Sequence, residues 1–166
     1  MEHTAHPDAP AWAAALEESA ISFFIRDSTW LYPLANLAHI YGLALVLGTI
    51  IALDLRLLGA GRRVVTAEAL SRFLTPITVV GLVLSIASGL VLFTADASAI
   101  AVNAVFFNKM VLLVLGLLNA WLFRRLWWRE LPQWDIRPPL IGRLQALASI
   151  AIWLLLATAG RLIAYF

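Results

Sequence analysis

A stretch without Lys, Arg, Asp or Glu runs from Leu34 to Leu53, and it constrains the fold more than any other feature of this sequence. Because an α-helix rises about 1.5 Å per residue, some 20 apolar residues cross the roughly 30 Å hydrocarbon core of a bilayer. Trp30 precedes the stretch and Asp54 follows it, as expected for residues at the two membrane interfaces. Residues 30–53 are therefore predicted to form a transmembrane helix.

The composition extends this prediction to the whole chain. Hydrophobic residues make up 62% of the sequence and charged residues 13%, whereas about a quarter of a soluble domain is charged. The absence of cysteine excludes disulfides, iron–sulfur clusters, thiolate metal sites and cysteine nucleophiles. We expect an all-α integral membrane four-helix bundle, one domain over residues 29–166, in contact with the lipid bilayer. Its further spans are expected at 73–93, 104–123 and 144–166.

The N-terminal residues precede this bundle. Residues 1–10 are polar and contain proline, which is typical of a flexible tail. In residues 11–28, apolar side chains such as Trp12, Leu16 and Phe23 recur at near-helical spacing, with the charged residues off that stripe. This pattern predicts a short helix that lies in the membrane interface.

The arginines predict the orientation of the bundle. Nearly all of them lie in the loop after the first span and the loop after the third. Cytoplasmic loops are enriched in Lys and Arg, so both loops are expected in the cytoplasm, with the N-terminus and C-terminus outside. The same clustering explains the small positive net charge, and nucleic-acid binding is not expected.

The candidate binding site is a set of polar residues at similar depth in the outer half of the bundle. Charged groups in hydrocarbon are costly and usually face the bundle interior or a wet cavity. For Lys109 and Arg161 the alternative is that they reach the headgroups, and for His39 it is a structural hydrogen bond to a neighbouring helix. The set consists of Asn36, His39, Asn108, Lys109 and Arg161.

His39 is the one histidine outside the N-terminal tail, and it is also a candidate metal ligand. A b-type haem takes axial ligands that are typically histidines. Ligation by two histidines would therefore require a homodimer, and Lys109 or Arg161 could pair with a haem propionate. Haem b is retained as an alternative cofactor.

Two further features concern packing. Asp54 lies where the first predicted span ends, and we interpret Asp54 and Arg56 as a structural ion pair, with Arg124 or Arg125 as alternative partners. In the second span, small residues recur every four positions, a spacing that lets helices approach closely, either within the bundle or in a homodimer. These small residues are Gly81, Ser85 and Gly89.

Three segments carry recognisable short motifs around His39, Asn108-Lys109-Met110 and Gly160-Arg161: PLANLAHIYGLALVLGTIIALDLRLLG, FFNKMVLLVLGLLNAW and LASIAIWLLLATAGRLIAYF. They resemble a family of uncharacterised bacterial four-span proteins, a "domain of unknown function" family. More distantly, they are similar to cytochrome b561-like and copper-resistance membrane proteins, which use several histidines. The resemblance implies a multi-pass protein of the bacterial inner (cytoplasmic) membrane and supplies no activity.

The sequence thus favours a non-enzymatic membrane subunit or small-ligand binder that uses the outer polar residues. The alternative is an electron-transfer membrane subunit that holds haem b through His39.

The predicted orientation can be checked by cysteine labelling, since the chain has no cysteine of its own. A cysteine introduced at Ala60, in the first arginine-rich loop, should react with a membrane-impermeant maleimide only after the inner membrane is opened. Labelling of intact spheroplasts at this position would contradict the orientation.

Overall fold

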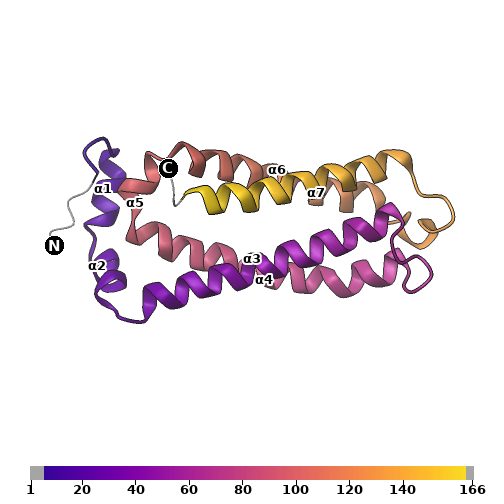
Figure 1. Cartoon of the computed structure of the whole chain (residues 1–166), viewed down its shortest axis with the longest axis horizontal. Helices are drawn as coiled ribbons and strands as arrows, with labels where there is room; N and C mark the ends of the chain where they lie inside the picture. Colours follow the sequence, from indigo (N-terminus) through magenta and orange to yellow (C-terminus); the bar gives the residue numbers. More distant parts are fainter. Residues whose placement is uncertain (1–5, 164–166) are drawn as a thin grey trace.

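The computed structural model describes residues 6–163, and these residues form helices and turns without strands. The expected all-α membrane bundle is confirmed, because four helices are long and apolar enough to cross a bilayer. They run side by side along the length of the molecule (Figure 1). Their bounds are Leu31–Leu58 (α3), Ala67–Ala95 (α4), Ala104–Trp127 (α6) and Leu140–Leu162 (α7).

The helices extend past the predicted spans because helical geometry continues into the polar residues beside the apolar core. Thr66 caps α4 by accepting a hydrogen bond from the backbone N–H of Ala69 at 3.2 Å. At the end of α3, Gly59 has a φ of 116°, which a residue with a side chain rarely adopts. The predicted tail and fourth span lie partly outside the described residues, at positions 1–5 and 164–166.

The segment predicted as one interfacial helix, residues 11–28, forms two helices, so that prediction was wrong in detail. They are α1 (Ala11–Glu17) and α2 (Ala20–Asp27). Ser19 interrupts the helix because its extended backbone and its side chain cap α2, accepting from the Ser22 N–H at 3.3 Å. With α5 (Ala97–Ala101), the two helices lie across one end of the bundle (Figure 1).

Hydrogen bonds hold α1, α2 and α5 together at this end of the bundle. Arg26 donates to the carbonyl of Glu17 at 2.8 Å and to that of Ala95, at the end of α4, at 3.1 Å. The Glu17 carboxyl group accepts from the backbone of Ser98 in α5 at 2.7 Å. The backbone N–H of His6 donates to the Ser98 hydroxyl at 3.1 Å, so the predicted tail contacts the bundle at this point.

The closest helix pair is α3 with α4. A Cβ built on Gly42 would lie 2.7 Å from the Ser85 backbone nitrogen, and one built on Gly81 would lie 2.9 Å from the Gly42 carbonyl. Small residues let backbones approach in this way. The small residues of the second span therefore pack against α3 within the bundle, which is the intramolecular alternative predicted from the sequence.

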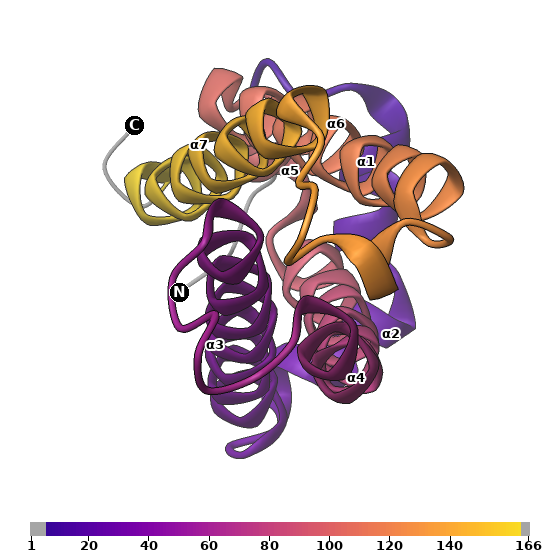
Figure 2. The same cartoon turned by 90° about the vertical axis from the view of Figure 1, so that its right-hand side faces the viewer.

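A second hairpin, α6 with α7, packs against the first, and the backbones come closest along α3 and α7. The buried centre of this junction consists of Val46, Trp153 and Leu156. Seen along the bundle, the α3 ribbon lies beside α7, while the ribbons of α4 and α6 are farther apart (Figure 2). Side chains connect α4 and α6, since the rings of Phe93 and Phe106 stack with their centres 5.5 Å apart.

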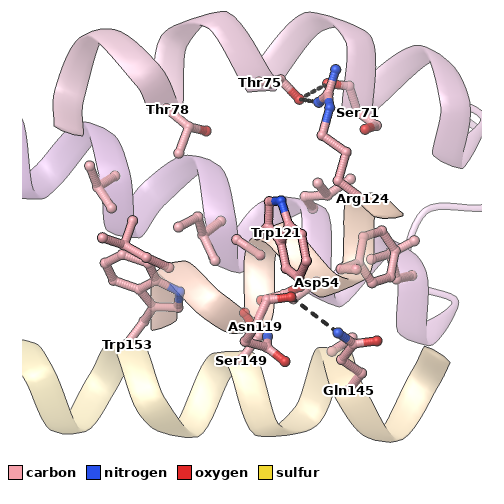
Figure 3. A pocket seen from close by; sticks show the side chains of 18 of the residues that line it. Asp54, Ser71, Thr75, Thr78, Asn119, Trp121, Arg124, Gln145, Ser149 and Trp153 are labelled. Atoms are coloured by element: carbon pink, nitrogen blue, oxygen red, sulfur yellow. Dashed lines mark hydrogen bonds between the residues drawn. The ribbon is translucent and has the colours of Figure 1, made fainter. Parts of the chain in front are cut away.

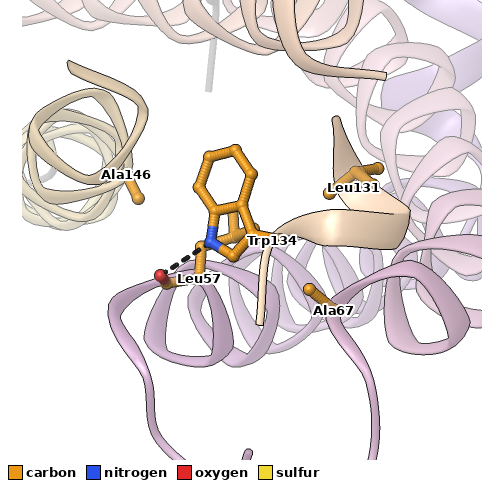
Figure 4. Packing of buried hydrophobic residues seen from close by; sticks show 5 residues of the cluster. All are labelled: Leu57, Ala67, Leu131, Trp134 and Ala146. Atoms are coloured by element: carbon orange, nitrogen blue, oxygen red, sulfur yellow. Dashed lines mark hydrogen bonds between the residues drawn. The ribbon is translucent and has the colours of Figure 1, made fainter. Parts of the chain in front are cut away.

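At the loop end, Trp134 closes the bundle. Its ring is 1% exposed and lies among Leu57, Ala67, Leu131 and Ala146 (Figure 4). The indole N–H donates to the Leu57 carbonyl at 3.0 Å, which satisfies one of the free carbonyls at the end of α3. The loop between α6 and α7 is thus anchored to both hairpins.

The close approach of α3 and α4 predicts the effect of a single methyl group. Gly42→Ala should lower the free energy of unfolding by about 2 kcal/mol, because its Cβ would meet backbone atoms of α4 that cannot move aside. Gly48→Ala is the matched control on the same helix, since a Cβ there meets nothing within 4 Å. Thermal unfolding in detergent should show a lower midpoint for Gly42→Ala only, and equal midpoints would contradict the packing.

Candidate functional site

A cavity of about 270 Å³ lies between the four long helices, toward the loop end. Most of its lining is apolar, with Val46 and Leu53 of α3 and Leu82 of α4 among the contributors. Thr75 and Thr78 of α4 face it from the side opposite α7 (Figure 3). The cavity is therefore enclosed by both hairpins at the level where α4 and α6 separate.

Asp54 is the acidic group of this cavity. The residue is 6% exposed, and its Oδ2 atom is buried without a hydrogen-bond partner among the described residues. The Ser149 side chain of α7 also lines the cavity and lies near the carboxyl group (Figure 3). The predicted ion pair between Asp54 and Arg56 is wrong, because Arg56 turns toward the loops and pairs with Asp135. One acceptor of Asp54 therefore remains free inside the bundle.

The buried Arg56 side chain finds its partners in the loops. The residue is 3% exposed, and besides the ion pair with Asp135 its Nε donates to the Val65 carbonyl at 2.6 Å. The backbone N–H of Ala67, the first residue of α4, donates to the other carboxylate oxygen of Asp135 at 3.4 Å. Asp135 thus connects the ends of α3 and α4 to the loop before α7, a role that Asp54 cannot fill from inside the cavity.

Trp153 supplies a free donor to the same cavity. The residue is 2% exposed, and its indole Nε1 is buried without a partner among the described residues. A Cβ built on Gly116 of α6 would lie 3.1 Å from two ring atoms, so the ring is held against that helix. Trp153 and Ser149 are four residues apart on α7 and share a helical face. Figure 3 places Trp153, Ser149 and Asp54 around one space.

Several other polar side chains of the cavity already have partners. Thr78 donates to Thr49 at 2.8 Å, and Thr75 donates to the Ser71 carbonyl at 2.6 Å. Gln145 donates to the backbone of α6 and accepts from Trp127 at 2.9 Å. In the described part of the chain, several buried side-chain atoms lack a hydrogen-bond partner. Two of these atoms belong to cavity residues, and they are Asp54 Oδ2 and Trp153 Nε1.

Arg124 lies at the cavity between α6 and α4. Its guanidinium donates to the Thr75 hydroxyl of α4 at 3.5 Å, and its Cζ lies 4.5 Å from the ring centre of Trp128. Arg124, Thr75 and Trp128 all line the cavity. Arg124 therefore places a positive charge beside the cavity, on the side of α6.

The outer polar set predicted from the sequence is only partly brought together. His39 Nδ1 lies 2.9 Å from the Ser85 carbonyl and 3.2 Å from the Ser88 hydroxyl, so the imidazole is held against α4. Lys109 is close enough to interact electrostatically with His39, and its alkyl chain passes beside Gly160 of α7. His39 therefore makes the structural hydrogen bond that was its alternative interpretation.

The other members of that set lie on the outside of the bundle. Asn36, Asn108 and Arg161 are exposed residues of α3, α6 and α7. The described residues contain no group of three or more His, Cys, Asp or Glu side chains able to hold a metal ion. Among their buried side-chain atoms without a partner, two belong to cavity residues, Asp54 and Trp153, and one belongs to Ser85, whose carbonyl contacts His39.

Comparison with known proteins addresses the resemblance noted in the sequence. A family model described as a family of unknown function, DUF6644, matches residues 17–166. The chain belongs to DUF6644. The match covers α2 and the four long helices of this DUF6644 protein, and therefore both the cavity and His39. Neither the curated proteins nor the solved structures gave a match.

Sequence reasoning missed the cavity for a definite reason. The sequence placed Asp54 at the end of the first span and predicted an ion pair for it. In the fourth span, Arg161 was the one residue predicted to belong to a binding site. The available signal was the pair Ser149 and Trp153, a hydroxyl and an indole one helical turn apart in the otherwise apolar stretch 146–157. Which helices leave a gap between them depends on side-chain fit, which hydropathy does not report.

Proposed function

We propose that this DUF6644 protein binds a small amphipathic molecule, drawn from the bilayer, in the cavity between its two hairpins. The observation that carries the proposal is a free acceptor on Asp54 and a free donor on Trp153, both buried in one mostly apolar cavity. The protein would then be a ligand-binding membrane subunit, as the sequence favoured, but with the ligand at Asp54.

The energetic argument concerns groups that lack partners. A buried polar group without a hydrogen bond destabilises the folded state by about 1–3 kcal/mol, and a native protein tolerates it where a ligand, ion or water supplies the bond. Hydroxyl and amide groups can both donate to the Asp54 oxygen and accept from the Trp153 N–H, so a ligand that carries them would provide the missing partners. Its apolar part would pack against the apolar lining of the cavity.

The size and location of the cavity also favour such a ligand. Its volume of about 270 Å³ is close to the lower limit of roughly 300 Å³ for small-molecule sites. We expect its entrance between α4 and α6, whose backbones approach each other less closely than those of α3 and α7. In the expected inner-membrane orientation, the cavity would lie in the cytoplasmic half of the bilayer.

A matched set of naphthalene derivatives tests this proposal. Protein in lipid nanodiscs should bind 1-naphthol above the background of empty nanodiscs, as followed by naphthol fluorescence. The derivative 1-methoxynaphthalene, which has no donor, should bind about tenfold more weakly because it leaves the Asp54 oxygen unpaired. Asp54→Leu should abolish that preference, and Trp153→Phe should weaken 1-naphthol binding while leaving some preference for the hydroxyl.

Asp96→Asn is the control, because this acidic residue accepts from Tyr32 at the other end of the bundle. It should keep the preference for 1-naphthol. Asp54→Ala serves as a second variant should the leucine side chain fail to fit. Equal partition of both compounds into protein-containing and empty nanodiscs would contradict the proposal.

A second function, haem b binding, is favoured by one observation at His39. Its Nδ1 lies 2.9 Å from a backbone carbonyl, the arrangement that leaves Nε2 as the metal-binding nitrogen. Lys109 lies near enough to pair with a propionate. Haem bound there would supply one-electron chemistry, and ligation by two histidines would require a second copy of the chain.

Absorption spectroscopy tests the haem proposal. Protein purified from haem-sufficient cells should show a Soret band that is lost in His39→Ala and retained in His6→Ala, with both variants folded. A colourless preparation of folded protein would contradict haem binding. It would not affect the proposal for Asp54, which the naphthol measurements test separately.

A further inference from the structure

At the loop end of α6, Arg125 and Arg129 lie outside the lining of the ligand cavity and beside Arg124, which belongs to it. Arg124, Arg125 and Arg129 are exposed and lie within six residues of one another. The ion pairs of the described residues all involve other side chains. A surface hollow is lined by these arginines together with Trp121, Leu126 and Trp128. We call these six residues the basic patch.

The arginines share faces with the aromatic residues. Residues four apart lie on one side of a helix, so Trp121 stands one turn before Arg125, and Arg124 one turn before Trp128. The Arg124 guanidinium stacks at 4.5 Å from the Trp128 ring centre, which restrains one of the three charges at the surface. The basic patch is therefore partly ordered before any partner binds.

The position of the patch identifies its partner. Trp121 is 61% exposed and Leu126 is 57% exposed, and both continue the apolar outer surface of α6. A partner that fits must therefore carry negative charge at the arginines and a hydrocarbon chain along the helix. We propose that the basic patch binds an anionic phospholipid, with the phosphate between the arginines and an acyl chain beside Trp121.

Phosphate chemistry suits this arrangement. Arginine presents a planar fork of donors that matches phosphate oxygens in a bidentate manner, and it is less strongly hydrated than lysine. Free inorganic phosphate offers the same oxygens but no chain for the apolar part of the patch. The lipid is therefore distinguished from free phosphate by the contribution of its acyl chain.

The test uses two double variants that remove the same charge. Arg125→Gln with Arg129→Gln alters the basic patch and spares Arg124, which lines the ligand cavity. Arg62→Gln with Arg63→Gln is the matched control, because these exposed arginines lie in the loop between α3 and α4 at the same end of the bundle. Both double variants should fold, as their side chains lie on the surface.

Protein in a non-ionic detergent is titrated with dioctanoyl phosphatidylglycerol, and bound lipid is counted by native mass spectrometry. Wild-type protein should bind this lipid about tenfold more tightly than dioctanoyl phosphatidylcholine. The preference should fall to near unity in the patch variant and persist in the control variant, and millimolar inorganic phosphate should not compete. Equal losses in both variants, no preference in wild type, or full competition by phosphate would each overturn the proposal.

Discussion

The contact between α3 and α7 is the constraint on which the rest of the structure depends. In a bilayer, apolar helices gain nothing by leaving lipid for one another, so association requires close van der Waals fit. Gly42 and Gly81 provide that fit inside the first hairpin, and Gly116 receives the Trp153 ring inside the second. The two hairpins then meet along α3 and α7, while α4 and α6 contact each other through side chains such as Phe93 and Phe106. The result is a four-helix bundle built from two hairpins, with a cavity between them.

This geometry gives α3 a central position. The helix carries His39 near one end, packed against α4, and Asp54 near the other, within the cavity. Beyond Asp54, the buried Arg56 pairs with Asp135 and holds the two loops together. Under the proposed function, stability and binding would thus be separated along one helix, since the loop contacts are satisfied while the cavity retains polar atoms without partners. Proteins commonly accept such a cost where they bind something.

The sequence predicted those features that depend on neighbouring residues. Hydropathy located the four long helices, and the small residues of the second span pack as the intramolecular alternative required. Features that depend on distant residues escaped prediction. Arg56 pairs with a residue 79 positions away, and Trp134 donates to a carbonyl 77 positions away. The position of Asp54 at a cavity between the hairpins depends on how side chains from all four long helices fit together, which no local pattern encodes.

The position of the cavity among four helices able to cross a membrane also determines how a ligand would be selected. A molecule that enters the cavity from the bilayer, as proposed, has a local concentration that is fixed by its partition between water and lipid. Each buried CH₂ group is worth about 0.8 kcal/mol, which is roughly a fourfold change in that partition. Much of the apparent affinity measured from water would therefore belong to the bilayer. The protein itself would contribute discrimination among molecules that the lipid has already concentrated, by the hydrogen bonds they form at Asp54 and Trp153.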